Sequence, residues 1–335
     1  MIHPKLWPIK QQILKRSAIP ILCGPFRGEV GFEALYWIPF LKRFAKSHGI
    51  DTERLIPVTR GGMGKLYGMG EPIELYGLRT PQDIRVENRV QHAKHQQLKQ
   101  THWVDFDRKA LADAAKVLRL DSFLTLHPGW MFQRLNQFFL SETGPAALER
   151  EAFFEPLTVP APPDDLVLPE KFVAVRFYHR YTFPMHPQLI EFAQESIRQI
   201  AKGVPVILLN SGIHADDHID VAVKDTENVY KLTDLCDITP QNNLAAQASV
   251  IGRALGFVGT YGGLAQLALR LGKPSVSYYQ EWGGTAMAHK HLADAIALQR
   301  NLPHIVQKVG EIPLMQTVMP LFKGVQTKDL THSTI

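Results

Sequence analysis

Short apolar runs alternate with helical patterns through the second half of the chain. The runs are rich in Val, Ile, Leu and Phe, as buried strands are, and cover residues 172–177, 204–209, 229–232, 254–258 and 275–278. Between them, apolar residues recur at helical spacing over residues 189–201, 244–253 and 264–271. Strands that alternate with helices of this length predict βαβ units and a parallel sheet.

The first half opens with a strand, a glycine-rich loop and a helix. A β-prone run over residues 19–23 is followed by the loop 24–31. Apolar residues then recur at helical spacing from Phe32 to Phe44, and we expect a kink at Pro39, because proline lacks the N–H that a helix interior needs.

Three further segments complete this half. Residues 55–58 and 122–126 are short apolar runs that predict strands. The stretch 79–119 is polar and basic, and we expect it to form a solvated helix and loops.

Proline marks the best domain boundary. Five prolines and two aspartates lie between residues 156 and 169, which is typical of a stiff, exposed linker. A chain of 335 residues also suggests two domains, at about 150 residues each. We therefore predict an α/β protein with two Rossmann-like domains that face each other across a cleft. The predicted parts are a first domain over residues 1–158, a linker over 159–170, a second domain over 171–310 and a tail over 311–335 that could pack back on the first domain.

Composition and charge narrow the possible partners. Hydrophobic residues make up 45% of the chain and charged residues 21%, a balance typical of globular rather than disordered proteins. The net charge is +5, and most of the excess lies in residues 1–165. This modest, dispersed charge fits an anionic small molecule or an anionic membrane surface, whereas binding of nucleic acid usually needs a dense basic stripe.

Cysteine usage and the length of apolar runs bear on the compartment. Cys23 and Cys236 are too few for a disulfide scaffold or a cysteine-built zinc site. No apolar run approaches the roughly 18–20 residues of a membrane span, and no signal-peptide pattern is visible, so we expect a cytoplasmic protein. Residues 6–16 interleave apolar and basic side chains, which predicts either a surface helix or a peripheral contact with the inner face of the membrane.

The strongest candidate for ligand binding follows the strand predicted over 254–258. Thr260 and Tyr261 precede Gly262 and Gly263, which open the next helix. Free N–H groups and the helix dipole favour an anion there, and glycine lets a phosphate approach the backbone closely. We interpret this turn as a diphosphate site. The alternative is a tight turn that needs glycine for its geometry alone.

Polar residues follow two other strands of the second domain. Arg176, His179 and Arg180 stand at the end of the first strand, where they could bind phosphates; pairing of Arg176 with a nearby carboxylate is the alternative. Asn210 and Ser211 end the next strand. Ligands of such sheets bind beyond the carboxyl ends of the strands, so we expect the site in the cleft between the domains.

Other patterns are weak or absent. His214, Asp216 and His218 resemble a metal-binding string, but a dinuclear site of this pattern needs histidine where Asp216 stands. We expect a solvated loop there and predict no metal and no cofactor. The chain has no Gly-x-Ser-x-Gly elbow and no Gly-x-Gly-x-x-Gly after its first strand, which argues against an α/β-hydrolase and a dehydrogenase. The glycine-rich residues 61–65 lack the spacing of a P-loop.

The order of elements over residues 229–280 resembles the donor-binding domain of GT-B glycosyltransferases, in particular the heptosyltransferase-like group. The matching segments are Thr260–Gly263, Leu264–Ala268 and Leu271–Ser275. One departure concerns the acidic residue of the family's Asp-Ser/Thr-Gly loop, which is missing from Thr260-Tyr261-Gly262. The resemblance therefore leaves open a donor nucleotide different from that of heptosyltransferases.

The resemblance also gives the N-terminal loop a role. Such enzymes place a glycine–acid pair after the first strand, with the acid facing the acceptor, and Gly28 and Glu29 occupy that place. Glu29 would be a general base, and Glu33, one turn further on, could orient its partner or replace it. The alternative for both acids is electrostatic capping of the helix. Arg27 is expected to be an anion ligand or a loop clamp.

These features together predict a glycosyltransferase of cell-surface polysaccharide or lipopolysaccharide synthesis. It would move a sugar from a nucleotide-activated donor to a glycan or glycolipid acceptor, without a metal ion and with inversion. The first domain would bind the acceptor and the second the donor, with Glu281 on the ribose hydroxyls. Two alternatives stay open: a nucleotide-sugar epimerase of the same fold, and a non-catalytic module that binds nucleotide sugars.

Overall fold

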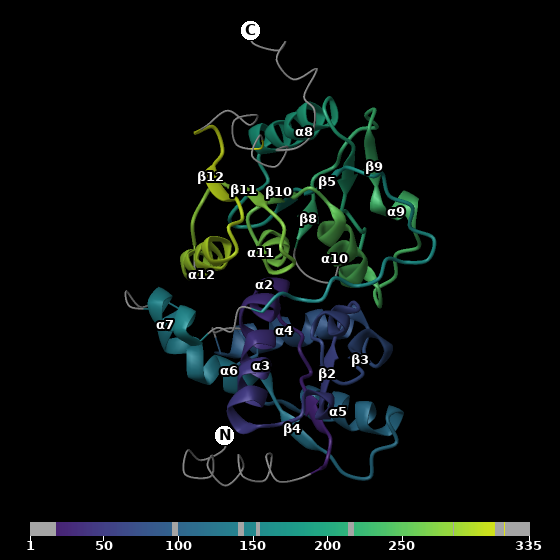
Figure 1. The fold of residues 1–335 in the computed structure, drawn as a ribbon, viewed down its shortest axis with the longest axis vertical. Helices are drawn as coiled ribbons and strands as arrows, with labels where there is room; N and C mark the ends of the chain where they lie inside the picture. Colours follow the sequence, from purple (N-terminus) through teal and green to yellow (C-terminus); the bar gives the residue numbers. More distant parts are fainter. Residues whose placement is uncertain are drawn as a thin grey trace. The chain divides into compact units, whose positions relative to one another are not determined.

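The computed structural model describes residues 18–95, 100–139, 144–151, 155–213, 218–283 and 285–311, together with Val318 (Figure 1). The chain divides into two compact units. Unit 1 comprises Met1–Pro160 and Thr239–Ala245, and unit 2 comprises Ala161–Ile238 and Ala246–Ile335. Residues 239–245 thus belong to unit 1, although the sequence predicted them within the second domain. Each unit contains a parallel sheet and helices, which confirms the α/β class.

Unit 1 has a four-stranded sheet in the order β3-β2-β1-β4, and all its strands run parallel. The strands are β1 (Ile21–Cys23), β2 (Leu55–Thr59), β3 (Ile73–Glu74) and β4 (Leu124–Leu126). In β1, Leu22 lies beside Ile56 of β2 on one side and Thr125 of β4 on the other. Because the strands are parallel, their carboxyl ends share one edge of the sheet, where the loop after β1 begins.

The first helix of unit 1 contains a wider turn. It comprises α2 (Val30–Phe32), the π-helical turn η2 (Glu33–Trp37) and α3 (Ile38–His48). The turn ends at Trp37, two residues before Pro39, where the sequence predicted a kink. Proline has no N–H to donate to the preceding turn. Gly49 then ends α3 in the left-handed conformation, which glycine adopts without strain.

Two helices occupy most of the polar stretch 79–119. α4 (Pro81–His95) fully buries only Ile84, as a solvated helix would. The expectation of a solvated stretch was wrong for α5 (Asp105–Val117), whose buried residues are Asp107, Ala110, Leu111, Ala114 and Ala115. Small apolar residues at helical spacing form a stripe there that the surrounding charged residues conceal in the sequence. The remaining elements of unit 1 are η3 (Thr52–Arg54), η4 (Met63–Leu66), η5 (Leu75–Gly77), α6 (Pro128–Leu135), η6 (Asn136–Phe138) and α7 (Gly144–Glu151).

Unit 2 has a six-stranded parallel sheet in the order β12-β11-β10-β5-β7-β9. Its strands are β5 (Val173–Arg176), β7 (Val206–Leu208), β9 (Val229–Lys231), β10 (Phe257–Thr260), β11 (Ser275–Tyr279) and β12 (His304–Lys308). A separate antiparallel pair joins β6 (Tyr178–His179) to β8 (Ile219–Asp220). β10 begins later than the predicted start at residue 254, because the N–H of Ala254 still donates to Val250 at the end of the preceding helix.

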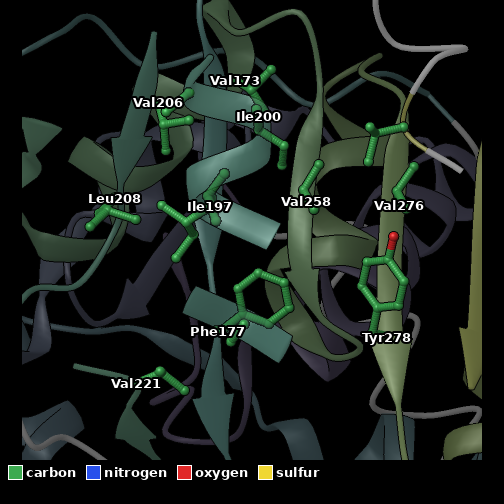
Figure 2. Close-up of a cluster of buried hydrophobic side chains, with 14 of the residues drawn as sticks. Val173, Phe177, Ile197, Ile200, Val206, Leu208, Val221, Val258, Val276 and Tyr278 are labelled. Carbon is green, nitrogen blue, oxygen red and sulfur yellow. The ribbon is translucent and has the colours of Figure 1, made fainter. Parts of the chain in front are cut away.

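Helices connect these strands. They are α8 (Pro187–Ala201), α9 (Leu232–Leu235), α10 (Asn243–Arg253), α11 (Gly263–Arg270) and α12 (Ala286–Gln299). Figure 2 shows side chains from the sheet and α8 gathered into one buried cluster. The strands contribute alternate residues, such as Val206 and Leu208 of β7, and α8 contributes Ile197 and Ile200 at helical spacing. The predicted strands and the predicted helix therefore meet in the core of unit 2.

Several predictions concern residues outside the described part of the chain. These include the basic segment 6–16 and residues 214–217, as well as the tail after residue 311 apart from Val318. Among the residues that the structure does describe, no helix combines the length and the apolar character needed to cross a membrane.

The close backbone approach at Gly259 in the sheet of unit 2 can be tested. A Cβ at Gly259 of β10 would lie 2.0 Å from the carbonyl oxygen of Arg176 on β5. Gly259→Ala should therefore lower the free energy of unfolding by about 1–3 kcal/mol, the usual range for overpacking. Gly77→Ala is the control, since no described atom beyond its chain neighbours lies within 4 Å of the added Cβ. Urea unfolding should show a change below about 0.5 kcal/mol for the control, and an equally small change for Gly259→Ala would contradict the close approach.

Candidate functional site

The loop after β1 is fastened to the strands on both sides. The N–H of Gly24 donates to the carbonyl of Leu126 at 2.9 Å, and the N–H of Phe26 donates to that of Val58 at 2.8 Å. Gly24 has a φ of +148°, and a Cβ there would lie 2.4 Å from the Val58 carbonyl oxygen, so the position requires glycine. These two hydrogen bonds thus fix the loop before Glu29, the residue that precedes the first helix.

Glu29 occupies the N-cap position of α2, with an extended backbone (φ −76°, ψ 150°). Its side chain is partly exposed and makes no capping hydrogen bond to the first turn of the helix, all of which the structure describes. Its carbonyl accepts a hydrogen bond from the N–H of Glu33 at 3.1 Å. The accessible carboxylate is compatible with both predicted roles, general base and electrostatic cap, since electrostatic capping needs no side-chain hydrogen bond.

Glu33 is entirely buried, in contrast to Glu29. Its Oε1 accepts hydrogen bonds from the hydroxyls of Thr59 and Tyr67, the latter at 2.6 Å, and its Oε2 lies 3.2 Å from Nη1 of Arg60. Burial raises the pKa of Glu33, while the Arg60 charge and these hydrogen bonds act against the rise. Because the carboxylate has no exposed surface, these contacts favour a supporting role over direct proton exchange with a substrate.

Arg27 is buried and connects the loop to α4 and α5. Its Nε donates to Asp107 at 2.9 Å, its Nη1 to Asn88 at 2.5 Å, and its backbone N–H to the side chain of Gln100 at 2.8 Å. Burial acts to raise the pKa of Asp107, but hydrogen bonds from His127 and Arg27 outweigh it, so the pKa lies below its ordinary value. Of the two predicted roles, anion ligand and loop clamp, these contacts are those of a clamp. Gly28, the next residue, is also buried.

The glycine-rich loop after β2 binds a carboxylate of the protein itself. The N–H groups of Gly61 and Gly62 donate to the two oxygens of Glu74 at 2.9 and 2.7 Å. Both glycines have positive φ, +67° and +77°, which points successive N–H groups at one anion. Burial raises the pKa of Glu74 above its ordinary value, and hydrogen bonds from the backbone offset only part of the rise. This anion-binding turn is therefore filled from within unit 1.

The same loop contacts the segment 239–245. The N–H of Ala245 donates to the carbonyl of Gly61 at 2.8 Å. A Cβ at Gly61 would lie 2.9 Å from Leu244, and a Cβ at Gly62 would lie 2.6 Å from the Cβ of Ala245. The two glycines thus serve the packing of unit 1 as well as the hydrogen bonds to Glu74.

In unit 2, the turn predicted to bind a diphosphate follows β10. The Thr260 hydroxyl, at the end of this strand, accepts from the N–H of Tyr178 and donates to its carbonyl, both at 3.0 Å. A Cβ at Gly262 would lie 2.0 Å from the hydroxyl oxygen of Tyr178. α11 begins at Gly263 without a side-chain cap at Gly262. A helix start, a phenol hydroxyl and a close approach to the backbone therefore coincide at one point of the carboxyl edge.

Arg176 lies at the same edge, at the end of β5. Its Nε donates to Asp220 of β8 at 2.8 Å and its Nη1 donates to Gln247 of α10 at 3.1 Å. The guanidinium also lies over the ring of Tyr178, 5.7 Å from its centroid. Of the two interpretations of Arg176, the structure shows the pair with a carboxylate.

Three other predicted donor-site residues have partners within unit 2. The ring of His179 is buried, and its Nδ1 lies 3.3 Å from the carbonyl of Pro184. The Asn210 side chain donates to the carbonyl of Val221 at 3.2 Å. The Ser211 hydroxyl is buried and accepts from a backbone N–H two residues on, at 3.4 Å. These contacts shape the edge of the sheet.

Tyr261, Arg180 and Glu281 differ in their access to solvent. Tyr261 is buried, its hydroxyl donates to the carbonyl of Ala286 at 3.2 Å, and burial raises its pKa. Its ring meets that of Trp282 edge-on, with the centroids 5.4 Å apart. Arg180 is partly exposed and Glu281 is exposed, so both are accessible to a ligand.

The partners of several site residues were missed from the sequence. They are Thr59, Arg60, Tyr67 and Glu74 in unit 1, and Tyr178, Asp220 and Gln247 in unit 2. Thr59 and Arg60 had a usable signal, because Thr59 ends β2 and Arg60 follows it, at the same edge as the loop after β1. Tyr67 and Asp220 had none, since they lie in irregular or two-residue elements that show no periodicity.

Within the described ranges, no three histidine, cysteine or acidic side chains gather as a metal ion would require. His214 and Asp216 lie outside those ranges, and the ring of His218 packs against Tyr178, with centroids 4.2 Å apart. No protein-family model matches the chain, and a comparison with curated proteins gave no match either.

Burial of Glu33 should make stability depend on pH. Its folded-state pKa is raised, so between the unfolded value near 4.5 and the folded value the native protein binds this proton more strongly. The contribution of Glu33 to the free energy of unfolding therefore falls as pH rises through that window. Because Glu33→Gln cannot titrate, the wild-type value minus the variant value should decline as the pH is raised from about 4. Urea unfolding at a series of pH values measures this difference, and an increase with pH would contradict the burial argument.

Proposed function

We propose that the protein is a glycosyltransferase of the GT-B type, in which unit 2 binds a nucleotide sugar and unit 1 binds the acceptor. The observation that carries this proposal is the turn between β10 and α11. The first N–H groups of α11 have no partner within the helix, and the Tyr178 hydroxyl stands beside Gly262 at the helix start. This arrangement suits a diphosphate, because N–H groups and the helix dipole both favour negative charge. We also propose that the two units are the Rossmann-like domains of a GT-B fold.

The leaving diphosphate would be stabilised by groups of the protein. The start of α11 and the Tyr178 hydroxyl supply hydrogen-bond donors, and Arg180, which is partly exposed, supplies a positive charge. Arg176 is the weaker candidate, because Asp220 already compensates its charge. We assign neutralisation of the leaving group to these residues rather than to a metal ion, and the ribose hydroxyls to Glu281.

In unit 1, we assign proton removal from the acceptor hydroxyl to Glu29. Its carboxylate is accessible and stands at the N-cap position of the first helix. Glu33 is buried and has hydrogen bonds on both oxygens, so we assign it to the support of the loop. A base that activates the acceptor for direct displacement of the diphosphate implies inversion at the sugar carbon that is attacked. The acceptor would be a glycan or a glycolipid.

The donor site can be tested by binding. At least one of UDP, GDP, ADP, CMP and dTDP should raise the melting temperature, because a ligand that binds only the folded state stabilises it. Gly263→Asp should weaken this nucleotide by about 10- to 100-fold, since it places a carboxylate at the helix start. Gly263→Asn has the same size without the charge and should keep most of the affinity. Equal affinities of the two variants would remove the helix start from the site.

The assignment of the base can be tested by turnover. Glu29→Gln keeps the size of the side chain but cannot accept a proton, so nucleotide release at saturating donor should fall by about 10²–10⁴ while donor affinity stays nearly unchanged. Glu53→Gln alters an exposed acid of the same unit and should keep full turnover. A fully active Glu29→Gln would contradict the assignment. Donor isomerisation without nucleotide release would favour an epimerase, and binding without any turnover would favour a binding module.

A further inference from the structure

Two contacts fix the peptide that carries Glu29. The carbonyl of Gly28 belongs to the peptide bond between Gly28 and Glu29, and it accepts a hydrogen bond from Nη2 of Arg60. The next carbonyl, that of Glu29, accepts from the N–H of Glu33. The two hydrogen bonds come from Arg60 and Glu33, and these two residues also pair with each other through the carboxylate of Glu33. The backbone is therefore held on both sides of the Glu29 Cα atom.

Arg60 is itself held in place. Its side chain is only 9% exposed, and its Nη1 lies 3.2 Å from the Glu33 carboxylate. The hydroxyls of Thr59 and Tyr67 occupy the other oxygen of that carboxylate, so it cannot rotate away without losing hydrogen bonds. A planar guanidinium presents separate N–H groups in a fixed geometry, which lets one side chain bridge a carboxylate and a carbonyl.

We infer that Arg60 is a positioning residue: through the Gly28 carbonyl it fixes the backbone from which the Glu29 carboxylate reaches the acceptor. This inference rests on the proposed function, in which Glu29 removes the proton. General-base catalysis depends on the distance and direction between the base and the proton, and a displacement of about 1 Å can cost roughly a hundredfold in rate. Loss of the Arg60 bridge should therefore lower turnover and leave nucleotide binding by unit 2 unchanged.

The chain offers matched variants for this test. Arg60→Met combined with Glu33→Gln removes the bridge without leaving an unpaired buried charge, and Arg60→Lys keeps the charge but not the planar pair of donors. Arg79 makes the same two kinds of contact elsewhere in unit 1, pairing with Asp113 at 2.8 Å and donating to the carbonyl of Leu78. The controls are therefore Arg79→Met combined with Asp113→Asn, and Arg79→Lys.

The first readout is amide hydrogen exchange of residues 24–33 in the full chain, which requires no substrate. Loss of an anchor raises the population of locally open states, so exchange in this segment should become about tenfold faster in both Arg60 variants. The Arg79 variants should change it by less than about twofold. Unchanged exchange in the Arg60 variants would overturn the inference.

The second readout is turnover of the donor that the wild-type protein accepts. We expect kcat to fall about ten- to a hundredfold in both Arg60 variants, with the nucleotide Kd unchanged. Faster exchange with an unchanged kcat would overturn the positioning role. Faster exchange in a protein whose wild type turns over no nucleotide sugar would uphold the anchoring of the loop and overturn the glycosyltransferase proposal. The two failures are thereby distinguished.

Discussion

The buried ion pair between Glu33 and Arg60 is the interaction on which the candidate site of unit 1 depends. A carboxylate taken out of water is costly unless a charge and hydrogen bonds compensate it. Here Arg60 supplies the charge, and Thr59 and Tyr67 supply the hydrogen bonds. Because Arg60 also binds the Gly28 carbonyl, the same contacts join the first helix, the end of β2 and the loop after β1. The position of Glu29 is thus a consequence of how unit 1 compensates one buried charge.

The same physical requirement sorts the other candidate residues in both units. Arg27 and Arg176 were attractive as anion ligands because they stand at the carboxyl edges of parallel strands. Each is paired with an aspartate, Asp107 and Asp220 respectively, so a ligand phosphate would have to compete with a carboxylate that is already in place. Arg180 and Glu281 keep access to solvent. Burial and pairing therefore separate residues that hold the edge from residues that are available to a ligand.

The regular elements were largely predictable, whereas their cross-connections were not. Helix α8 was expected over residues 189–201 and is found at Pro187–Ala201, because its apolar stripe repeats with the helical period. The partners of the site residues lie far away in sequence: Arg27 meets Asp107 across 80 positions, and Arg176 meets Gln247 across 71. A single sequence carries no signal for such pairs. The segment 239–245 was misplaced for the same reason, since its ties to Gly61 and Gly62 are long-range contacts.

Glycine was the residue type whose role was hardest to predict from the sequence, and the structure shows why. Gly61 and Gly62 form an anion-binding turn, but the anion is Glu74 of the same unit. Gly262 has a packing reason of its own, because the Tyr178 hydroxyl occupies the space that a Cβ would take. Glycine at this turn therefore leaves room for the Tyr178 hydroxyl, whether or not a phosphate binds. The features that favour an anion are therefore the neighbours of the glycine: the first N–H groups of α11, for which the helix has no partner, and a phenol hydroxyl beside them. Gly61 and Gly62 have an internal carboxylate to receive their N–H groups. Gly262 has no side chain that could cap the start of α11. The start of α11 is therefore the better candidate for an external anion.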